Sequence, residues 1–243
     1  MFKIYKLKVF ILFISFILPG INKGFSQSEK INQIESILNS LEEDKMIADS
    51  ISKYSRRLFY FGNFEKANEW ALKGITLAEK HNRDKSLVDL KIIHSRYLAR
   101  YDQLDSSLFV LKSLLNKQYK KTTRQEFYIY QNIAGVYSQL NLLDSALLAN
   151  YHVDSIGTAH NFTKLSNNQI SIAELFYKQG LTKRSIEATS KALEISEIES
   201  DTTNHLFILF RAAELFYVNN ALDKYAHSAK EYIELSELVN SKP

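Results

Sequence analysis

The chain has 243 residues, which is enough for one large domain or two small ones. It contains no cysteine, so disulfide bonds, thiolate metal sites and cysteine nucleophiles are excluded. The formal charge of +4 comes from residues 1–26, which hold four lysines and no acidic residue. The rest of the chain is neutral overall, which excludes the global basic charge typical of a nucleic-acid-binding protein.

The first 26 residues have the three parts of a secretory signal peptide. A cationic segment ends at Lys8, an apolar run covers 9–18, and small residues stand at Gly24 and Ser26, next to the expected cleavage point. The run is shorter than the ~20 residues that span a bilayer. We therefore expect residues 1–26 to be a signal peptide and the mature chain to begin at Gln27. The protein is then exported to a bacterial periplasm or beyond, with no stable membrane span. A retained anchor and a buried helix are the alternatives.

Residues 27–47 are predicted to hold an N-terminal capping helix, over about 28–42, because Ile and Leu recur there at helical spacing. The remaining segment, 48–243, has little glycine, and its only proline is the last residue, which favours long helices over a turn-rich sheet. We expect ten helices in this segment, the last over about 222–239. Thr123 and Glu126 have the spacing of a capping box that opens one of them.

Turn-forming residues recur along this segment at intervals of 39 or 40 residues, and each separates two amphipathic runs. They are Gly62, Asp102, Asn141, Gly180 and Asn220. The pentapeptide 173–177 also recurs, letter for letter, at 213–217. This periodicity predicts five consecutive helix hairpins that bury their apolar faces against one another.

Side-chain size follows the same register. The residue seven positions before each turn is small: Ser55, Ser95, Ala134, Ala173 and Ala213. The residue four positions before each turn is large: Leu58, Leu98, Tyr137, Phe176 and Phe216. The residue five positions after each turn is small in four of the five units: Ala67, Ser107, Ala146, Ser185 and, as the exception, Tyr225. Small side chains at these positions let the two helices of a hairpin approach closely.

This pattern resembles the tetratricopeptide repeat (TPR) family, most clearly in Tyr177-Lys178-Gln179-Gly180 with Ser185 after it. The resemblance covers about 48–240 and implies an all-α fold, a right-handed α-solenoid of about five helix-turn-helix repeats after the N-terminal helix. The usual unit of the family has about 34 residues. Because the units here have 39 or 40, we expect longer helices or longer connecting loops.

The sequence shows no motif of an enzyme or a metal site. It has no Gly-x-Ser-x-Gly, no P-loop and no His-Glu-x-x-His, and its six histidines lack a metal-ligand spacing. We therefore expect a non-enzymatic protein with no catalytic residue, no cofactor and no metal.

Members of the TPR family bind partners on the concave face, which the first helix of each hairpin forms. When the family's partner-binding positions are transferred to this chain by register, the resemblance implies a groove on this face. The groove is basic near its N-terminal end, and acidic and tyrosine-rich near its C-terminal end. Its residues are Arg56, Tyr60, Arg96, Arg100, Gln139, Glu174, Tyr177, Glu214 and Tyr217. A face of mixed sign suits an extended peptide or a partner helix. The alternative is that these charged residues pair with their neighbours and solvate the surface.

Together, these features predict an exported scaffold or adaptor that binds a protein or peptide, and not nucleic acid. A stand-alone or truncated sensory input domain of a bacterial signalling system is the main alternative, and a cytoplasmic peptide-sensing regulator is another. The sequence leaves the partner and the oligomeric state open.

Overall fold

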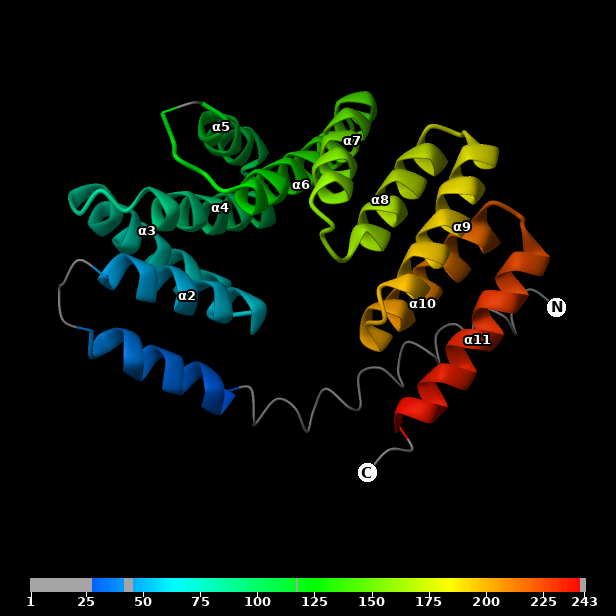
Figure 1. Cartoon of the computed structure of the whole chain (residues 1–243), viewed down its shortest axis with the longest axis horizontal. Helices are drawn as coiled ribbons and strands as arrows, with labels where there is room; N and C mark the ends of the chain where they lie inside the picture. Colours follow the sequence, from blue (N-terminus) through cyan, green and yellow to red (C-terminus); the bar gives the residue numbers. More distant parts are fainter. Residues whose placement is uncertain (1–27, 42–45, 117, 241–243) are drawn as a thin grey trace. The chain divides into compact units, whose positions relative to one another are not determined.

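The computed structural model describes residues 28–41, 46–116 and 118–240, and this part of the chain consists of helices joined by turns and loops (Figure 1). A first helix covers 28–39. It is followed by α2 (Ile47–Tyr60), α3 (Phe64–Lys80), α4 (Asp84–Arg100), α5 (Leu104–Leu114), α6 (Thr123–Gln139), α7 (Leu143–Ala159), α8 (Leu165–Lys178), α9 (Thr182–Ile198), α10 (Thr202–Val218) and α11 (Leu222–Asn240). The predicted helix hairpins are therefore present, as α2–α3, α4–α5, α6–α7, α8–α9 and α10–α11.

The chain divides into two compact units, with the boundary inside α4. The N-terminal unit extends to Tyr97 and contains the helix over 28–39, α2, α3 and most of α4. The C-terminal unit begins at Leu98 and contains α5 to α11.

All five predicted turn residues adopt the left-handed backbone conformation that ends an α-helix. Their φ angles are +79° at Gly62, +60° at Asp102, +58° at Asn141, +73° at Gly180 and +59° at Asn220. In each case the next residue's N–H donates to the carbonyl of the predicted large residue, five positions back. Leu181 donates to Phe176 at 2.9 Å, and Ala221 to Phe216 at 2.8 Å. This hydrogen bond reverses the chain within three residues.

The extra length of the repeat lies in the helices. Six of the helices, α3, α4, α6, α7, α9 and α10, have 17 residues. The turn within each hairpin has only three residues, as between Tyr60 and Phe64. Two such helices and two such turns account for a unit of about 40 residues.

The small side chains that follow the turns are buried. Ala67, Ser107, Ala146 and Ser185, the small residues after the turns, are all fully buried. Ser185 also donates a hydrogen bond to the Ala173 carbonyl at 2.9 Å, which ties α9 to α8. One cluster of buried residues extends from α7 to α10 and includes Ile172, Leu175 and Ile208. Buried apolar area of this kind is the main source of stability in a helical repeat.

Two predictions need correction at helix ends. The N-cap of α6 is Thr122 and not Thr123, because the Thr122 hydroxyl accepts from the Gln125 N–H and the Gln125 side chain accepts from the Thr122 N–H. Gln125 therefore completes the capping box in place of Glu126. The first helix ends at 39 rather than near 42, although it buries Ile34 and Leu38 as its apolar spacing predicts.

The predicted signal peptide lies outside the described residues. Among the residues that are described, no helix is both long enough and apolar enough to span a membrane.

Two glycines inside helices offer a matched test of this packing. A Cβ on Gly74 of α3 would lie 2.7 Å from Ile51 Cγ2 and 2.9 Å from Leu90 Cδ1, whereas a Cβ on Gly135 of α6 would meet nothing within 4 Å. Gly135→Ala should raise the free energy of unfolding by about 0.5–1 kcal/mol, because alanine favours the helix. Gly74→Ala should lower it by about 1–3 kcal/mol, because the core is overpacked. Urea denaturation of both variants measures the difference, and equal stabilisation would contradict the close contact.

Candidate functional site

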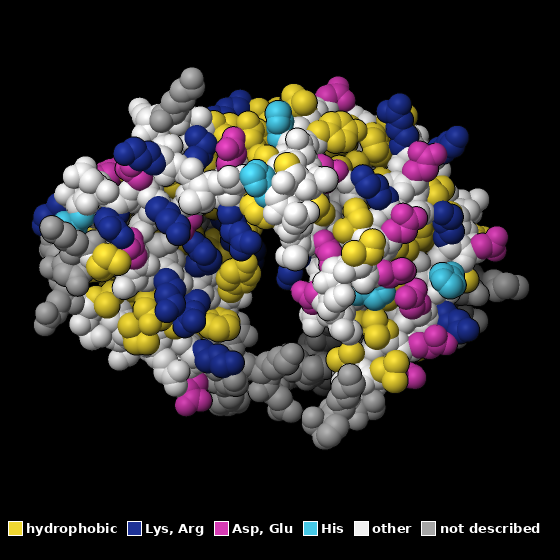
Figure 2. All heavy atoms as spheres, viewed as in Figure 1, with side chains coloured by type: hydrophobic (Ala, Val, Ile, Leu, Met, Phe, Trp, Pro, Cys, Tyr) yellow, Lys and Arg dark blue, Asp and Glu magenta, His cyan; other side chains and the backbone are white. Residues whose placement is uncertain are grey.

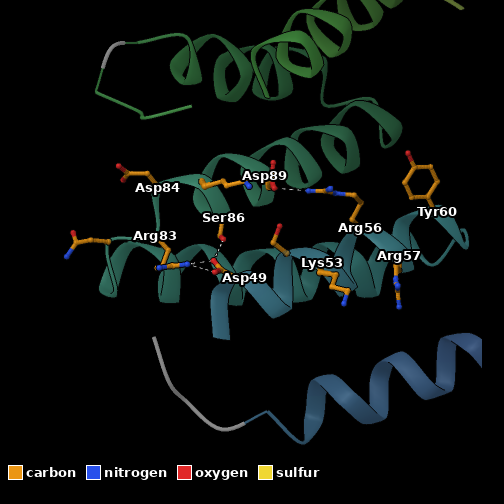
Figure 3. Close-up of a pocket in the computed structure, with 12 residues that line it drawn as sticks. Asp49, Lys53, Arg56, Arg57, Tyr60, Arg83, Asp84, Ser86 and Asp89 are labelled. Atoms are coloured by element: carbon orange, nitrogen blue, oxygen red, sulfur yellow. Dashed lines mark hydrogen bonds and ion pairs between the residues drawn. The ribbon is translucent and has the colours of Figure 1, made fainter. Parts of the chain in front are cut away.

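A cleft of about 670 Å³ lies between α2 and the start of α4 in the N-terminal unit (Figure 3). Charged and polar side chains form most of its lining: Asp49, Ser52, Lys53, Arg56, Arg57, Tyr60, Asn82, Arg83, Asp84, Lys85, Ser86 and Asp89. Five of these residues are cationic and three carry a carboxylate. The cleft therefore has a positive net charge, formed by the first helices of two consecutive hairpins.

Two sets of ion pairs connect the walls of the cleft. Asp49 near the start of α2 accepts hydrogen bonds from Arg83 and Ser86 beside the start of α4. Burial raises the pKa of Asp49, but these bonds and the charge of Arg83 outweigh it, so the pKa lies below its ordinary value. Farther along the same helices, the Arg56 guanidinium donates to Asp89 at 2.7 Å. These contacts fix the spacing between α2 and α4.

Lys53 and Arg57 are the cations of the cleft that remain available to a partner. They lie one helical turn apart on α2, and both are exposed. Among the described residues neither meets a carboxylate, and each has its cationic group near the Tyr54 ring, at 5.5 and 5.7 Å from the ring centre. Lys53, Arg57 and Tyr60 follow one another at helical spacing along α2 and are called the row here, and Tyr60 is 75% exposed. Figure 3 shows Arg56 directed at Asp89, whereas Lys53 and Arg57 project from α2 elsewhere.

Three of the predicted groove residues belong to this unit. Arg56 and Tyr60 line the cleft. Arg96 on α4 places its guanidinium 4.2 Å from the centre of the Phe59 ring, which keeps it half-buried against α2. Arg56 and Arg96 are thus held by contacts within the chain, and the row of Lys53 and Arg57 was missed. The sequence signal for that row is the spacing of two cations and a tyrosine at i, i+4 and i+7 on one helix.

In the C-terminal unit the predicted acidic residues Glu174 and Glu214 share one cation, Arg211. Arg211 on α10 bonds Glu174 of α8, and its other nitrogen donates to Glu214 at 2.8 Å. Burial lowers the pKa of Arg211, but the two carboxylates outweigh it and raise the pKa above its ordinary value. Arg211 was not among the predicted residues, and it partly neutralises the face that the register marks as acidic.

The other predicted residues of this unit lie at the exposed ends of the first helices. Tyr177 and Tyr217 are 44% and 54% exposed, and Arg100 and Gln139 are exposed as well. Phe207 on α10 is 49% exposed, one helical turn before Arg211, and adds an aromatic surface that the register did not predict. Tyr177, Tyr217 and Phe207 thus expose aromatic surface on α8 and α10.

Charge differs between the repeats at the two ends of the chain. Residues 46–97 contain ten Lys and Arg against six Asp and Glu, whereas residues 165–240 contain seven against eleven. Figure 2 shows Lys and Arg side chains gathered over the N-terminal repeats, and Asp and Glu side chains frequent over the C-terminal hairpins. Within the described residues, no group of three His, Asp or Glu side chains is placed to hold a metal ion.

Comparison with known proteins identifies the fold. No family model and no curated protein sequence matches the chain. BtubC (BKLC) from P. vanneervenii has a similar structure, with a TM-score of 0.68, 13% identity, and coverage of 90% of this chain and 91% of that one. The signal-transduction ATPase PH0952 from Pyrococcus horikoshii, which has a tetratricopeptide repeat sensor, gives a TM-score of 0.64 at 14% identity over 87% of this chain and 33% of that one. A Rap protein complexed with Competence and Sporulation Factor gives 0.59 at 15% identity over 89% and 72%.

The chain accordingly has the all-α fold of TPR-like repeat proteins, as the resemblance predicted. At identities of this size the similarity establishes the fold and carries no residue of a site from one protein to the other.

His94 on α4 offers a pH-dependent test of the N-terminal unit. Its Nδ1 lies 2.8 Å from Asn68 Oδ1 on α3, and burial lowers its pKa below the ordinary value of 6.5. The unfolded chain takes up a proton at this residue below about pH 6.5, which the folded chain resists. The free energy of unfolding should therefore have its full value above about pH 6.5 and decrease as the pH is lowered from there.

We expect His94→Gln, which keeps a hydrogen-bonding side chain, to flatten this dependence. Urea denaturation of the variant and the native chain at pH 7.5 and pH 5.5 measures it. The native chain should lose more stability between the two values. Parallel losses would show that His94 is not the titrating group.

Proposed function

We propose that the protein is a non-catalytic interaction module that holds an acidic segment of a partner protein in the cleft between α2 and α4. The observation that carries this proposal is the row formed by Lys53, Arg57 and Tyr60. Two cations without a carboxylate partner in the described chain stand beside a largely exposed tyrosine. Arginine and tyrosine contribute strongly to binding energy at protein interfaces.

The ion pairs around the cleft support recognition as well as folding. Asp49 is held by Arg83, and Asp89 by Arg56, so two of the three carboxylates in the lining are already paired. An incoming carboxylate consequently meets a net positive surface whose geometry is fixed before binding. Preorganisation of this kind reduces the entropy lost on association.

The fold supports an interaction role, because a Rap protein with the same architecture has been solved in complex with Competence and Sporulation Factor. The signal-like sequence over 1–26 supports export, which makes the partner an envelope or secreted protein. Edman sequencing of the protein recovered from the cell envelope tests this step: a first residue at Gln27 agrees with export and cleavage, and Met1 contradicts cleavage.

A second candidate function is the sensory input of a signalling system. The structural similarity to PH0952, a signal-transduction ATPase with a tetratricopeptide repeat sensor, favours it. In that case the acidic segment belongs to a membrane-bound regulator, and crosslinking in the cell would join the two proteins in comparable amounts.

A labelled peptide of alternating Glu and Leu tests the cleft directly. The double variant Lys53→Glu/Arg57→Glu should bind it at least about tenfold more weakly, because two attractive charges become repulsive. Binding to the native chain should also weaken as salt is added. Fluorescence anisotropy gives the dissociation constants.

The control is Lys183→Glu/Lys191→Glu, which makes the same change in net charge on α9, where both lysines are exposed. It should retain native affinity. If both double variants lose the same affinity, the effect comes from net charge and not from the cleft, and the proposed site is wrong.

A further inference from the structure

We infer that the acidic segment which fits the cleft is carried by a second copy of this chain, in the last two turns of α11. The inference rests on the proposed function of the cleft and names its partner. The two surfaces belong to different repeats, so the contact is heterologous and joins copies head to tail.

The exposed face of α11 is the first observation. Within 222–239 only Ser228 is buried, although α11 packs along α10. The corresponding positions on α9, 40 residues earlier, are more deeply buried, because α9 packs against both α8 and α10. Thr189 and Ser196 are buried, whereas their equivalents Ala229 and Ser236 are only half-buried.

The chemistry of that face is the second observation. Ile233 is 47% exposed and Leu238 61% exposed, and Glu234 and Glu237 lie beside them. This face of α11 therefore combines large exposed apolar side chains with carboxylates. It is an amphipathic surface of the kind that docks against another protein.

Electrostatics within α11 are the third observation. The negative end of the helix dipole lies at the C-terminus, where basic residues stabilise a helix and acidic residues do not. The last turn of α11 contains no basic residue, and Glu234 and Glu237 lie within its final seven residues. Lys230 lies 3.7 Å from Glu234, and in the described chain Glu237 has no cation beside it. Cations in contact with Glu234 and Glu237 would stabilise this end.

The cleft supplies those cations with a matching spacing. Lys53 and Arg57 lie one turn apart on α2, and Glu234 and Glu237 lie one turn apart on α11. Tyr60, at the end of the basic row, is exposed enough to cover Ile233 or Leu238. The opposite charges of residues 46–97 and 165–240 add long-range attraction in the same orientation.

Sedimentation velocity on protein purified from cells that express the full chain tests the inference. At low salt the average mass should rise with concentration, and added salt should return it to the monomer. The cleft variant Lys53→Glu/Arg57→Glu and the α11 variant Glu234→Lys/Glu237→Lys should each remain monomeric alone. An equimolar mixture of the two should associate again, because the native α11 of the first variant fits the native cleft of the second and the two reversed surfaces also complement each other. The control Lys183→Glu/Lys191→Glu should behave like the native chain.

The chain that combines both reversals should associate again, because its new surfaces are complementary. This result, unlike a loss, does not arise from misfolding. A native chain that stays monomeric at low salt, or a mixture that does not associate, overturns the inference. The Glu and Leu peptide separates the two proposals: binding by a monomeric native chain leaves the cleft function intact and refutes only self-recognition, whereas no binding and no association refutes both.

Discussion

In four of the five hairpins the residue five positions after the turn has a side chain of only one or two heavy atoms. Ala67, Ser107, Ala146 and Ser185 are fully buried near the start of the second helix, whereas Tyr225 stands at this position in the last hairpin. A larger side chain there would separate the two backbones and open the apolar stripes to water. The three-residue turn requires the same closeness, since its left-handed residue returns the chain beside the helix it has just left. The remaining packing of the repeats depends on these two local conditions.

Because both conditions are local, the repeat could be predicted from the sequence. Gly and Asn tolerate the left-handed conformation, so Gly180 and Asn141 were recognisable as turns. The turns between hairpins were harder to find. Asn82 and Asn161 are also left-handed, at +53° and +51°, but no size pattern around them stood out. The α6 cap was misplaced by one residue because either of two adjacent threonines satisfies the pattern, and only the backbone decides between them.

The candidate site was predictable only in part, and the reason is the range of the interactions. Register placed Arg56 and Tyr60 on the first helix of a hairpin, and both residues line the cleft. It could not show that Arg56 is paired with Asp89, 33 residues away, or that Glu174 is paired with Arg211, 37 residues away. Such pairs depend on how consecutive hairpins are rotated against one another. The charges that matter for binding are those left over after this pairing.

The comparison of equivalent contacts in the two units explains how a charged cleft arose on a repeated framework. Asp49 accepts from Ser86, 37 residues ahead, at the start of two consecutive first helices. In the C-terminal unit the equivalent bond joins Asn167 to Asn204, also 37 residues apart, at 2.7 Å.

A hydrogen bond thus joins consecutive hairpins at the same repeat position in both units. The charge of the residue before the second hairpin differs between them. The residue before α4 is Arg83, and the residue before α10 is Asp201, which lies 3.4 Å from Lys164. Arg83 and Asp201 thus have opposite charges at equivalent positions, although a side-chain hydrogen bond joins consecutive hairpins at both places. A repeat fold can therefore carry a basic surface at one end and an acidic surface at the other on the same backbone. That separation of packing from charge allows one chain to present both sides of an interface.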